Sequence, residues 1–327
     1  MSTTGLMARA FDQDTDVLPV VIAGPTGIGK SALALALAEE IGGEIVNYDS
    51  IQIYRGFDIG SSKPTPEERR GIRHHLIDII EPEEHFDAAL YEIAARSACA
   101  EIIERGKTPI LVGGTFFYLR AFLHGLPTLP GKNDLIRKRL RRISVARNGS
   151  ERLHRWLMHV DPVSGGRISV SDRHRLERAL EVYLLSGKPI SSWARPGKAG
   201  TPAVRTCRVA LQLPPPLLRQ RLESRVVEMF HCGLVDETRA LLAKHDRASR
   251  PFSSIGYREA VRLLDGELAA AEAVSETQRR TRAYAKRQRT FLRAEDMNPL
   301  DATLSMEAKL ARIVHLLDRS AGFPSSG

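Results

Sequence analysis

The sequence has few of the features that mark secreted, metal-rich or membrane proteins. Only 3 of its 327 residues are cysteine, and no two of them form a CxxC pair, which excludes a disulfide framework and a zinc-binding pattern. No apolar run reaches the roughly 18 residues that a membrane span requires. The first residues also lack the apolar stretch of a secretory signal. We therefore expect a cytoplasmic protein with no membrane partner.

Charge is unevenly distributed along the chain. The net charge is +9, and residues 131–200 contain 16 Lys/Arg against 6 Asp/Glu, whereas residues 1–130 contain 11 against 18. An acidic body with a strongly basic middle predicts a polyanionic partner held by that middle. A solvated, Arg-rich helical surface is the alternative, and charge alone does not separate the two.

Hydrophobic patterning predicts an α/β fold with an inserted domain. Short apolar runs alternate with helical segments, which is typical of a parallel sheet: strands are expected at 18–23, 44–48, 75–80, 109–112 and 206–212, and helices at 30–41, 86–105, 133–186, 215–244 and 256–293. Pro- and Gly-rich stretches bound the Arg-rich middle. The predicted organisation is a disordered tail (1–16), an α/β core (17–130 and 201–315) and a basic, all-helical insert (131–200).

A phosphate-binding loop follows the first predicted strand and opens the first helix. Its residues match G-x-x-x-x-G-K-[ST] in full: Gly24, Pro25, Thr26, Gly27, Ile28, Gly29, Lys30 and Ser31. Glycines let successive backbone N–H groups face one concavity, and the helix N-terminus adds positive potential. Lys30 supplies a cation for the outer phosphate oxygens, and the Ser31 hydroxyl can ligate Mg²⁺. The core is thus predicted to be P-loop NTPase-like.

The fate of the bound phosphate depends on the acids and hydroxyls near the loop. The strand at 109–112 ends in Gly113-Gly114-Thr115 rather than in the acid typical of ATPases. Asp49 follows another strand, and strand ends of such sheets converge on the ligand crevice. From spacing alone, Asp49 is a general base, a magnesium ligand or a helix cap.

Several further motifs, taken together and in order, resemble one family. They are Asp49-Ser50-Ile51-Gln52-Ile53-Tyr54-Arg55, Asp58-Ile59-Gly60-Ser61-Ser62-Lys63-Pro64, His74-His75-Leu76-Ile77-Asp78, Gly113-Gly114-Thr115, the stretch Asp172–Tyr183, Ile255-Gly256-Tyr257-Arg258-Glu259 and the stretch Lys286–Arg293. This set resembles the tRNA dimethylallyltransferase (tRNA isopentenyltransferase) family over about residues 18–300. The resemblance implies transfer of a dimethylallyl group from dimethylallyl diphosphate to N6 of the adenosine 3′ to the anticodon, with Mg²⁺ as cofactor.

The resemblance also implies residue roles. Asp49 would be the general base, Thr115 would assist the departing diphosphate oxygen, and Lys30 would act on the diphosphate. Contacts with the tRNA anticodon stem-loop are implied for Asp49, Ser50, Ile51, Gln52, Thr115, Arg137, His174, Arg175, Leu176, Glu177, Arg178, Ser253, Ser254, Ile255, Gly256, Tyr257, Arg258, Lys286, Arg287, Gln288, Arg289, Thr290, Phe291, Leu292 and Arg293. The protein is expected to be a monomer.

Three other functions remain open at this point. A P-loop small-molecule kinase would use Asp49 to activate a hydroxyl, but such a substrate needs no strongly basic insert. A prenyltransferase acting on free adenine nucleotides shares the core chemistry and likewise needs no insert. An RNA-binding switch that senses nucleotide occupancy does not require the Asp49 and Gly-Gly-Thr motifs.

Overall fold

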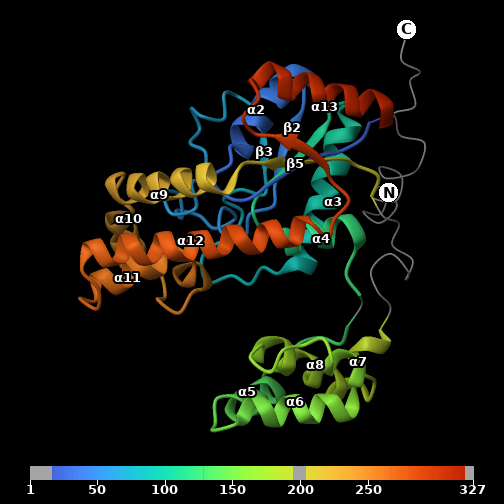
Figure 1. Cartoon of the computed structure of the whole chain (residues 1–327), viewed down its shortest axis with the longest axis vertical. Helices are drawn as coiled ribbons and strands as arrows, with labels where there is room; N and C mark the ends of the chain where they lie inside the picture. Colours follow the sequence, from blue (N-terminus) through green and yellow to red (C-terminus); the bar gives the residue numbers. More distant parts are fainter. Residues whose placement is uncertain (1–16, 128, 194–203, 321–327) are drawn as a thin grey trace. The chain divides into compact units, whose positions relative to one another are not determined.

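The chain folds into two compact units. The computed structural model describes residues 17–127, 129–193 and 204–320 (Figure 1). One unit is drawn from residues 1–123 and 204–327, and the other from residues 124–203. The predicted insert, residues 131–200, lies within the second unit, and its assignment as a tRNA-binding domain stays a prediction. The predicted tail, residues 1–16, lies outside the described residues.

A six-stranded parallel sheet forms the centre of the first unit, which confirms the predicted α/β class. Its strand order is β3-β2-β4-β1-β5-β6, with bounds β3 (His74–His75), β2 (Glu44–Asn47), β4 (Pro109–Val112), β1 (Val20–Ala23), β5 (Cys207–Gln212) and β6 (Asn298–Asp301). Every residue of β1, β2 and β4 is buried. Parallel strands covered on both faces need such continuous apolar runs, which is why these three strands could be predicted from the sequence.

Helices cover both faces of the sheet. On one face α2 (Lys30–Ile41) and α13 (Met306–Ser320) pack over a core that includes Val20, Ile22 and Ile110, and α3 (Ala88–Glu104) packs against β2 and β4 from the other (Figure 1). Glycines in the left-handed region, Gly29 and Gly42, begin and end α2. The short helix α4 (Phe116–His124) follows β4.

Four more helices extend the first unit beyond the sheet. They are α9 (Pro215–His231), α10 (Leu234–Leu242), α11 (Tyr257–Leu264) and α12 (Ala270–Leu292), with the short 3₁₀ helix η2 (Arg250–Ser253) before α11. Helix α12 packs along α9 and α11 (Figure 1). None of the described helices has the length and apolar character that crossing a membrane requires.

The second unit is a small helical domain with its own core. It contains α5 (Asp134–Ser144), α6 (Gly149–Val160), α7 (Pro162–Gly165), α8 (Arg173–Ser186) and the 3₁₀ helix η1 (Ile190–Ser192). Leu140, Leu153, Leu157, Leu176 and Leu180 are buried together, with Trp156 packed against them.

A buried carboxylate joins two helices of this unit. Glu181 of α8 is fully buried and accepts hydrogen bonds from the Asn133 backbone N–H (2.8 Å), Arg137 Nε (2.8 Å) and Arg178 Nη1 (2.7 Å). Burial raises the pKa of Glu181, but the bonds from Arg137, Asn133 and Arg178 outweigh it and leave that pKa below its ordinary value. The bonds from Arg137 and Asn133 therefore hold α5 against α8.

Some sequence-based element predictions were wrong in detail. The predicted strand at 75–80 is only β3, because Leu76 (φ 60°) and Asp78 (φ 55°) adopt left-handed backbone conformations that no strand contains. The helical stretch predicted at 215–244 divides at Gly233 (φ 96°), and the one at 256–293 divides near Gly266 (φ 75°). The edge strand β6 and helix α13, which extends past residue 315, were not predicted.

Replacing Glu181 should destabilise the second unit in a pH-dependent way. Glu181→Gln leaves two arginines without their buried partner, and we expect a loss of about 2–4 kcal/mol in unfolding free energy at pH 7. The pKa of Glu181 is lowered in the folded state, so its contribution is full above the ordinary pKa of 4.5 and disappears as the pH falls below it.

Tryptophan fluorescence can measure this loss because both tryptophans, Trp156 and Trp193, fall within residues 124–203. Denaturation curves by fluorescence should shift for Glu181→Gln at pH 7 and converge with wild type in acid, while exposed Glu151→Gln should leave them in place. An equal shift at both pH values would contradict the ion-pair account.

Candidate functional site

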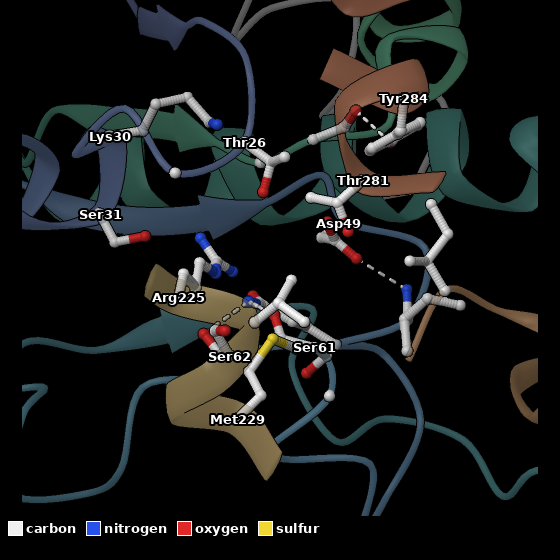
Figure 2. A pocket seen from close by; sticks show the side chains of 18 of the residues that line it. Thr26, Lys30, Ser31, Asp49, Ser61, Ser62, Arg225, Met229, Thr281 and Tyr284 are labelled. Carbon is white, nitrogen blue, oxygen red and sulfur yellow. Dashed lines mark hydrogen bonds between the residues drawn. The ribbon is translucent and has the colours of Figure 1, made fainter. Parts of the chain in front are cut away.

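Three loops meet at the carboxyl edge of the sheet. They follow β1 (the phosphate loop), β2 (Asp49) and β4 (Gly113–Thr115), and these strands are neighbours in the order β2-β4-β1. Together with α9 and α12 they line a cleft of about 1090 Å³ (Figure 2). The cleft therefore brings the phosphate loop, Asp49 and Thr115 to one place.

The phosphate loop presents part of its length to the cleft. Thr26, Gly27, Gly29, Lys30 and Ser31 line it. Gly27 (φ 73°) and Gly29 (φ 100°) have left-handed backbones, so the motif's glycines are required for the loop's shape.

The other loop residues support it from behind. Ile28 is buried in the core next to the sheet, and the Pro25 carbonyl accepts a hydrogen bond from Lys30 Nζ at 3.0 Å. The Lys30 side chain thus binds back onto its own loop.

Asp49 is held by its own backbone turn. Its Oδ1 accepts a hydrogen bond from the Ile51 N–H (2.9 Å), and its N–H donates to Asn47 Oδ1 (2.9 Å). A Cβ on Gly114 would lie 3.0 Å from Asp49 Oδ2, so glycine at that position keeps the second carboxylate oxygen free of a close neighbour. The carboxylate faces the cleft beside Thr281 and Tyr284 (Figure 2).

Thr115 lies beside Asp49 and is bonded to the same turn. Its Oγ1 accepts a hydrogen bond from the Ser50 N–H (2.9 Å) and donates one to Ser50 Oγ (3.0 Å). Thr115 also lines the cleft. Its hydroxyl must leave Ser50 before it can donate to a ligand.

The cleft brings a buried cation, Lys30, and a half-buried one, Arg225, near the Asp49 carboxylate. Burial and, to a smaller extent, the nearby charge of Arg225 lower the pKa of Lys30 to about 7, while Asp49 opposes the change. Burial also lowers the pKa of Arg225, again opposed by Asp49, and raises the pKa of Asp49 itself. A bound polyanion would relieve the cost of placing both cations here, so the site is suited to a phosphorylated ligand.

Helix α12 joins the loops across the cleft. Gln288 accepts a hydrogen bond from the Thr26 N–H (2.8 Å) and donates one to the Gly114 carbonyl (2.8 Å). Tyr284 donates to the same carbonyl at 2.6 Å. Gln288 is only 2% exposed, so its amide serves this bridge, and the RNA contact that the resemblance implied for it stays a prediction.

The predicted RNA-binding residues of the first unit divide between surface and interior. Tyr257 is fully buried, and Phe291 stacks on Phe116 with ring centroids 5.2 Å apart, so both rings make internal contacts. Ser254 and Ile255 are half-buried at the cleft, Gly256 is buried, and Leu292 and Arg289 are half-buried. The exposed members are Ser253, Arg258, Lys286, Arg287, Thr290 and Arg293.

The second unit shows the same division. Leu176 lies in its core, Arg137 and Arg178 are paired with Glu181, and Glu177 accepts a hydrogen bond from the Ser144 hydroxyl. His174 and Arg175 are exposed. Exposed cations that the sequence did not single out follow one another on α5: Lys138, Arg139, Arg141 and Arg142. Their placement on an amphipathic helix is the feature from which the sequence could have identified them.

The sequence also left unidentified several cleft residues that lie outside the phosphate loop. Helix α12 contributes Thr277, Thr281 and Tyr284, which share its cleft-facing side with Gln288 at helical spacing. The loop residues Ser61 and Ser62 and the α9 residue Met229 complete this wall (Figure 2). Arg221 and Arg225 of α9 also line the cleft.

The donor set around Ser31 suits Mg²⁺ held mainly by its ligand. Ser31 is exposed at the cleft as the first turn of α2 begins. No cluster of three or more His, Cys, Asp or Glu side chains able to hold a metal occurs among the described residues. One hydroxyl without a carboxylate cage fits an ion bound mostly by phosphate oxygens and water.

Comparison with known proteins points to one family. A family model described as IPP transferase matches residues 52–295. The tRNA dimethylallyltransferase of Koribacter versatilis is 46% identical over 281 residues, covering 86% of this chain and 91% of that protein. The protein of the same name from Solibacter usitatus is 48% identical over 277 residues, covering 84% and 90%.

Solved structures agree with the sequence relatives. The tRNA isopentenylpyrophosphate transferase of Bacillus halodurans has a TM-score of 0.68 and 32% identity, covering 94% of this chain and 98% of that one. A eukaryotic dimethylallyltransferase described as acting on tRNA has a TM-score of 0.73 and 26% identity, covering 94% and 81%.

Removing the Gln288 amide should destabilise the protein in the absence of RNA. Gln288→Ala leaves the Thr26 N–H without its acceptor, and we expect a loss of about 1–3 kcal/mol in unfolding free energy. Chemical denaturation followed by circular dichroism measures it, with exposed Thr290→Ala on the same helix as the control. Unchanged stability would show that the bridge is not structural.

The buried Lys30 should make stability depend on pH. Its pKa is lowered from 10.5 to about 7, so charging it costs the folded state stability below pH 7, and this cost is relieved as the pH rises toward 10.5. Lys30→Met removes the cost. The melting temperature of the ligand-free variant should exceed that of wild type by most at pH 6 and by least at pH 10. Exposed Lys286→Met should show no such trend, and a constant gap for Lys30→Met would contradict the account.

Proposed function

The chain belongs to the IPP transferase family, and from that premise we propose that it transfers a dimethylallyl group from dimethylallyl diphosphate to N6 of the adenosine 3′ to the anticodon of a tRNA. The named relatives are tRNA dimethylallyltransferases, so the enzyme class follows from membership. The kinase, free-nucleotide and RNA-switch alternatives find no relative among them. The activity belongs in the cytoplasm, and the monomeric state stays a prediction.

One juxtaposition carries the proposal: Asp49 and the phosphate loop share a single cleft. A transferase must hold a diphosphate leaving group and a proton acceptor on either side of the reacting carbon. Lys30 and Arg225 supply the positive charge for the first task, and Asp49 supplies the second. Met229 and Ile255 line the same cleft and offer apolar surface for the prenyl chain.

The reaction exchanges one bond for another. The adenosine N6 attacks C1 of the dimethylallyl group, the C1–O bond breaks, and the electron pair leaves with diphosphate. The N6 proton passes to the Asp49 carboxylate, whose raised pKa brings it closer to the range of an effective base. Positive charge preorganised at the leaving oxygen stabilises the transition state as negative charge develops there.

Several groups serve the departing diphosphate. Lys30 exchanges the Pro25 carbonyl for a phosphate oxygen, and the Thr115 hydroxyl exchanges Ser50 for the leaving oxygen. Bound at Ser31, Mg²⁺ would neutralise part of the diphosphate charge. Backbone N–H groups of the loop complete the cradle.

The RNA contacts are proposed for the exposed cations. Arg258, Lys286, Arg287 and Arg293 of the first unit, and Arg175 with the exposed α5 cations of the second, can reach phosphates without breaking a buried contact. Such contacts supply affinity and its salt dependence, while the pocket around Asp49 and Gln52 reads the base.

Asp49→Asn separates binding from chemistry. The amide keeps the side chain's shape but cannot accept the N6 proton, so the single-turnover rate at saturating tRNA should fall at least about 10²-fold. The dissociation constant for tRNA should stay within about threefold, since no phosphate contact is lost. The exposed Glu101→Gln serves as control. Weaker tRNA binding with an unchanged saturated rate would contradict the assignment of Asp49 as base.

A further inference from the structure

The loop Asp58–Lys63 forms one wall of the cleft and has no regular secondary structure. Gly60, Ser61 and Ser62 of this loop line the cleft directly. Ser62 adopts a left-handed backbone (φ 49°). A loop of this kind keeps one conformation only when its surroundings hold it.

Gln52 is bonded to the cleft side of this loop. Its Nε2 donates to the Ser61 and Ser62 carbonyls, both at 3.1 Å. Carbonyls only accept, so this network fixes which end of the amide is nitrogen, and both N–H groups are used. The remaining polar atom of the amide, Oε1, can only accept a hydrogen bond. Gln52 also lines the cleft.

An acceptor facing the nucleobase discriminates between purines. The exocyclic amine of adenine can donate to Gln52 Oε1, whereas the O6 of guanine in the same place would be repelled. Discrimination depends on the amide keeping its orientation. If the Ser61 and Ser62 carbonyls moved away, the amide could turn and offer its N–H groups instead.

Two side chains from distant helices hold the opposite side of the loop. Glu237 of α10 accepts from the Ile59 N–H at 2.9 Å, and Tyr257 of α11 accepts from the Gly60 N–H at 3.1 Å. Tyr257 also donates to Glu237 at 2.5 Å, so the two form one unit.

Packing adds to these bonds. A Cβ on Gly60 would lie 2.3 Å from the Tyr257 ring, so the loop backbone rests directly on that ring. Phe57, which precedes the loop, packs edge-on against the same ring with centroids 4.8 Å apart. The loop thus has a carboxylate and a phenol behind it and the Gln52 amide in front.

We propose that Glu237 and Tyr257 are positioning residues for the acceptor nucleobase. They hold the Asp58–Lys63 loop in one conformation and thereby orient the Gln52 amide so that it selects adenosine. The proposal rests on the proposed function and adds to it residues that touch no substrate. It also gives Tyr257 a role that accounts for its burial, in place of direct contact with RNA.

The test measures recognition apart from chemistry. The substrates are anticodon stem-loop RNAs with adenosine or guanosine at the acceptor position, together with labelled dimethylallyl diphosphate. For Glu237→Ala we expect the KM for the adenosine RNA to rise about tenfold, because the Ile59 N–H loses its half-buried hydrogen-bond acceptor. The preference for adenosine over guanosine RNA, measured as the guanosine RNA's inhibition constant divided by the KM for the adenosine RNA, should fall by about the same factor.

Two further readouts separate positioning from general damage. The KM for dimethylallyl diphosphate should not change, because the phosphate loop is not touched by these side chains. Tyr257→Phe keeps the ring but loses the hydroxyl, so it should shift the same ratio by less. Glu237→Gln can still accept from the Ile59 N–H and should restore most of the preference.

Exposed Asp236→Ala on the same helix is the matched control. Variants that melt at lower temperature but keep the wild-type KM and base preference would overturn the proposal and leave a role in stability alone. A wild-type protein that transfers no label would instead overturn the proposed function. The two failures are therefore distinguishable.

Discussion

The carboxamide of Gln288 is the contact on which the site depends. It bonds the Thr26 N–H of the phosphate loop and the Gly114 carbonyl of the β4 turn, and so fixes two of the three loops that form the cleft. Parallel strands bring loop ends near one another, but they do not fix the loops' conformations. A helix from late in the chain supplies that constraint, because α12 spans residues 270–292 while the loops lie before residue 116.

The electrostatics of the cleft follow from this geometry. Lys30 is buried and lies near half-buried Arg225 and Asp49, and burial shifts the pKa of each group toward its neutral form. The cations are thereby prepared for a polyanion and the carboxylate for a proton. The same desolvation lowers the stability of the folded protein when no ligand is bound, which is typical of catalytic clefts.

Local motifs could be predicted from the sequence and long-range contacts could not. The phosphate loop lies between one strand and one helix, so the neighbouring sequence was enough to assign its glycines and Lys30. Gln288 and Tyr257 lie in motifs that suggested RNA contact, yet their partners are 262 and 197 residues away, at Thr26 and Gly60. The strand predicted at 75–80 ends early because Asp78 turns to pair with buried Lys63, another contact that no local pattern contains.

Transfer of the prenyl group itself is the most direct test of the central claim. The protein is incubated with Mg²⁺, unmodified tRNA and dimethylallyl diphosphate labelled in its prenyl carbons, and the tRNA is then digested to nucleosides. The account predicts label on N6 of one adenosine, with one diphosphate released per label and no consumption of added ATP. Unlabelled tRNA accompanied by conversion of ATP to ADP would contradict it.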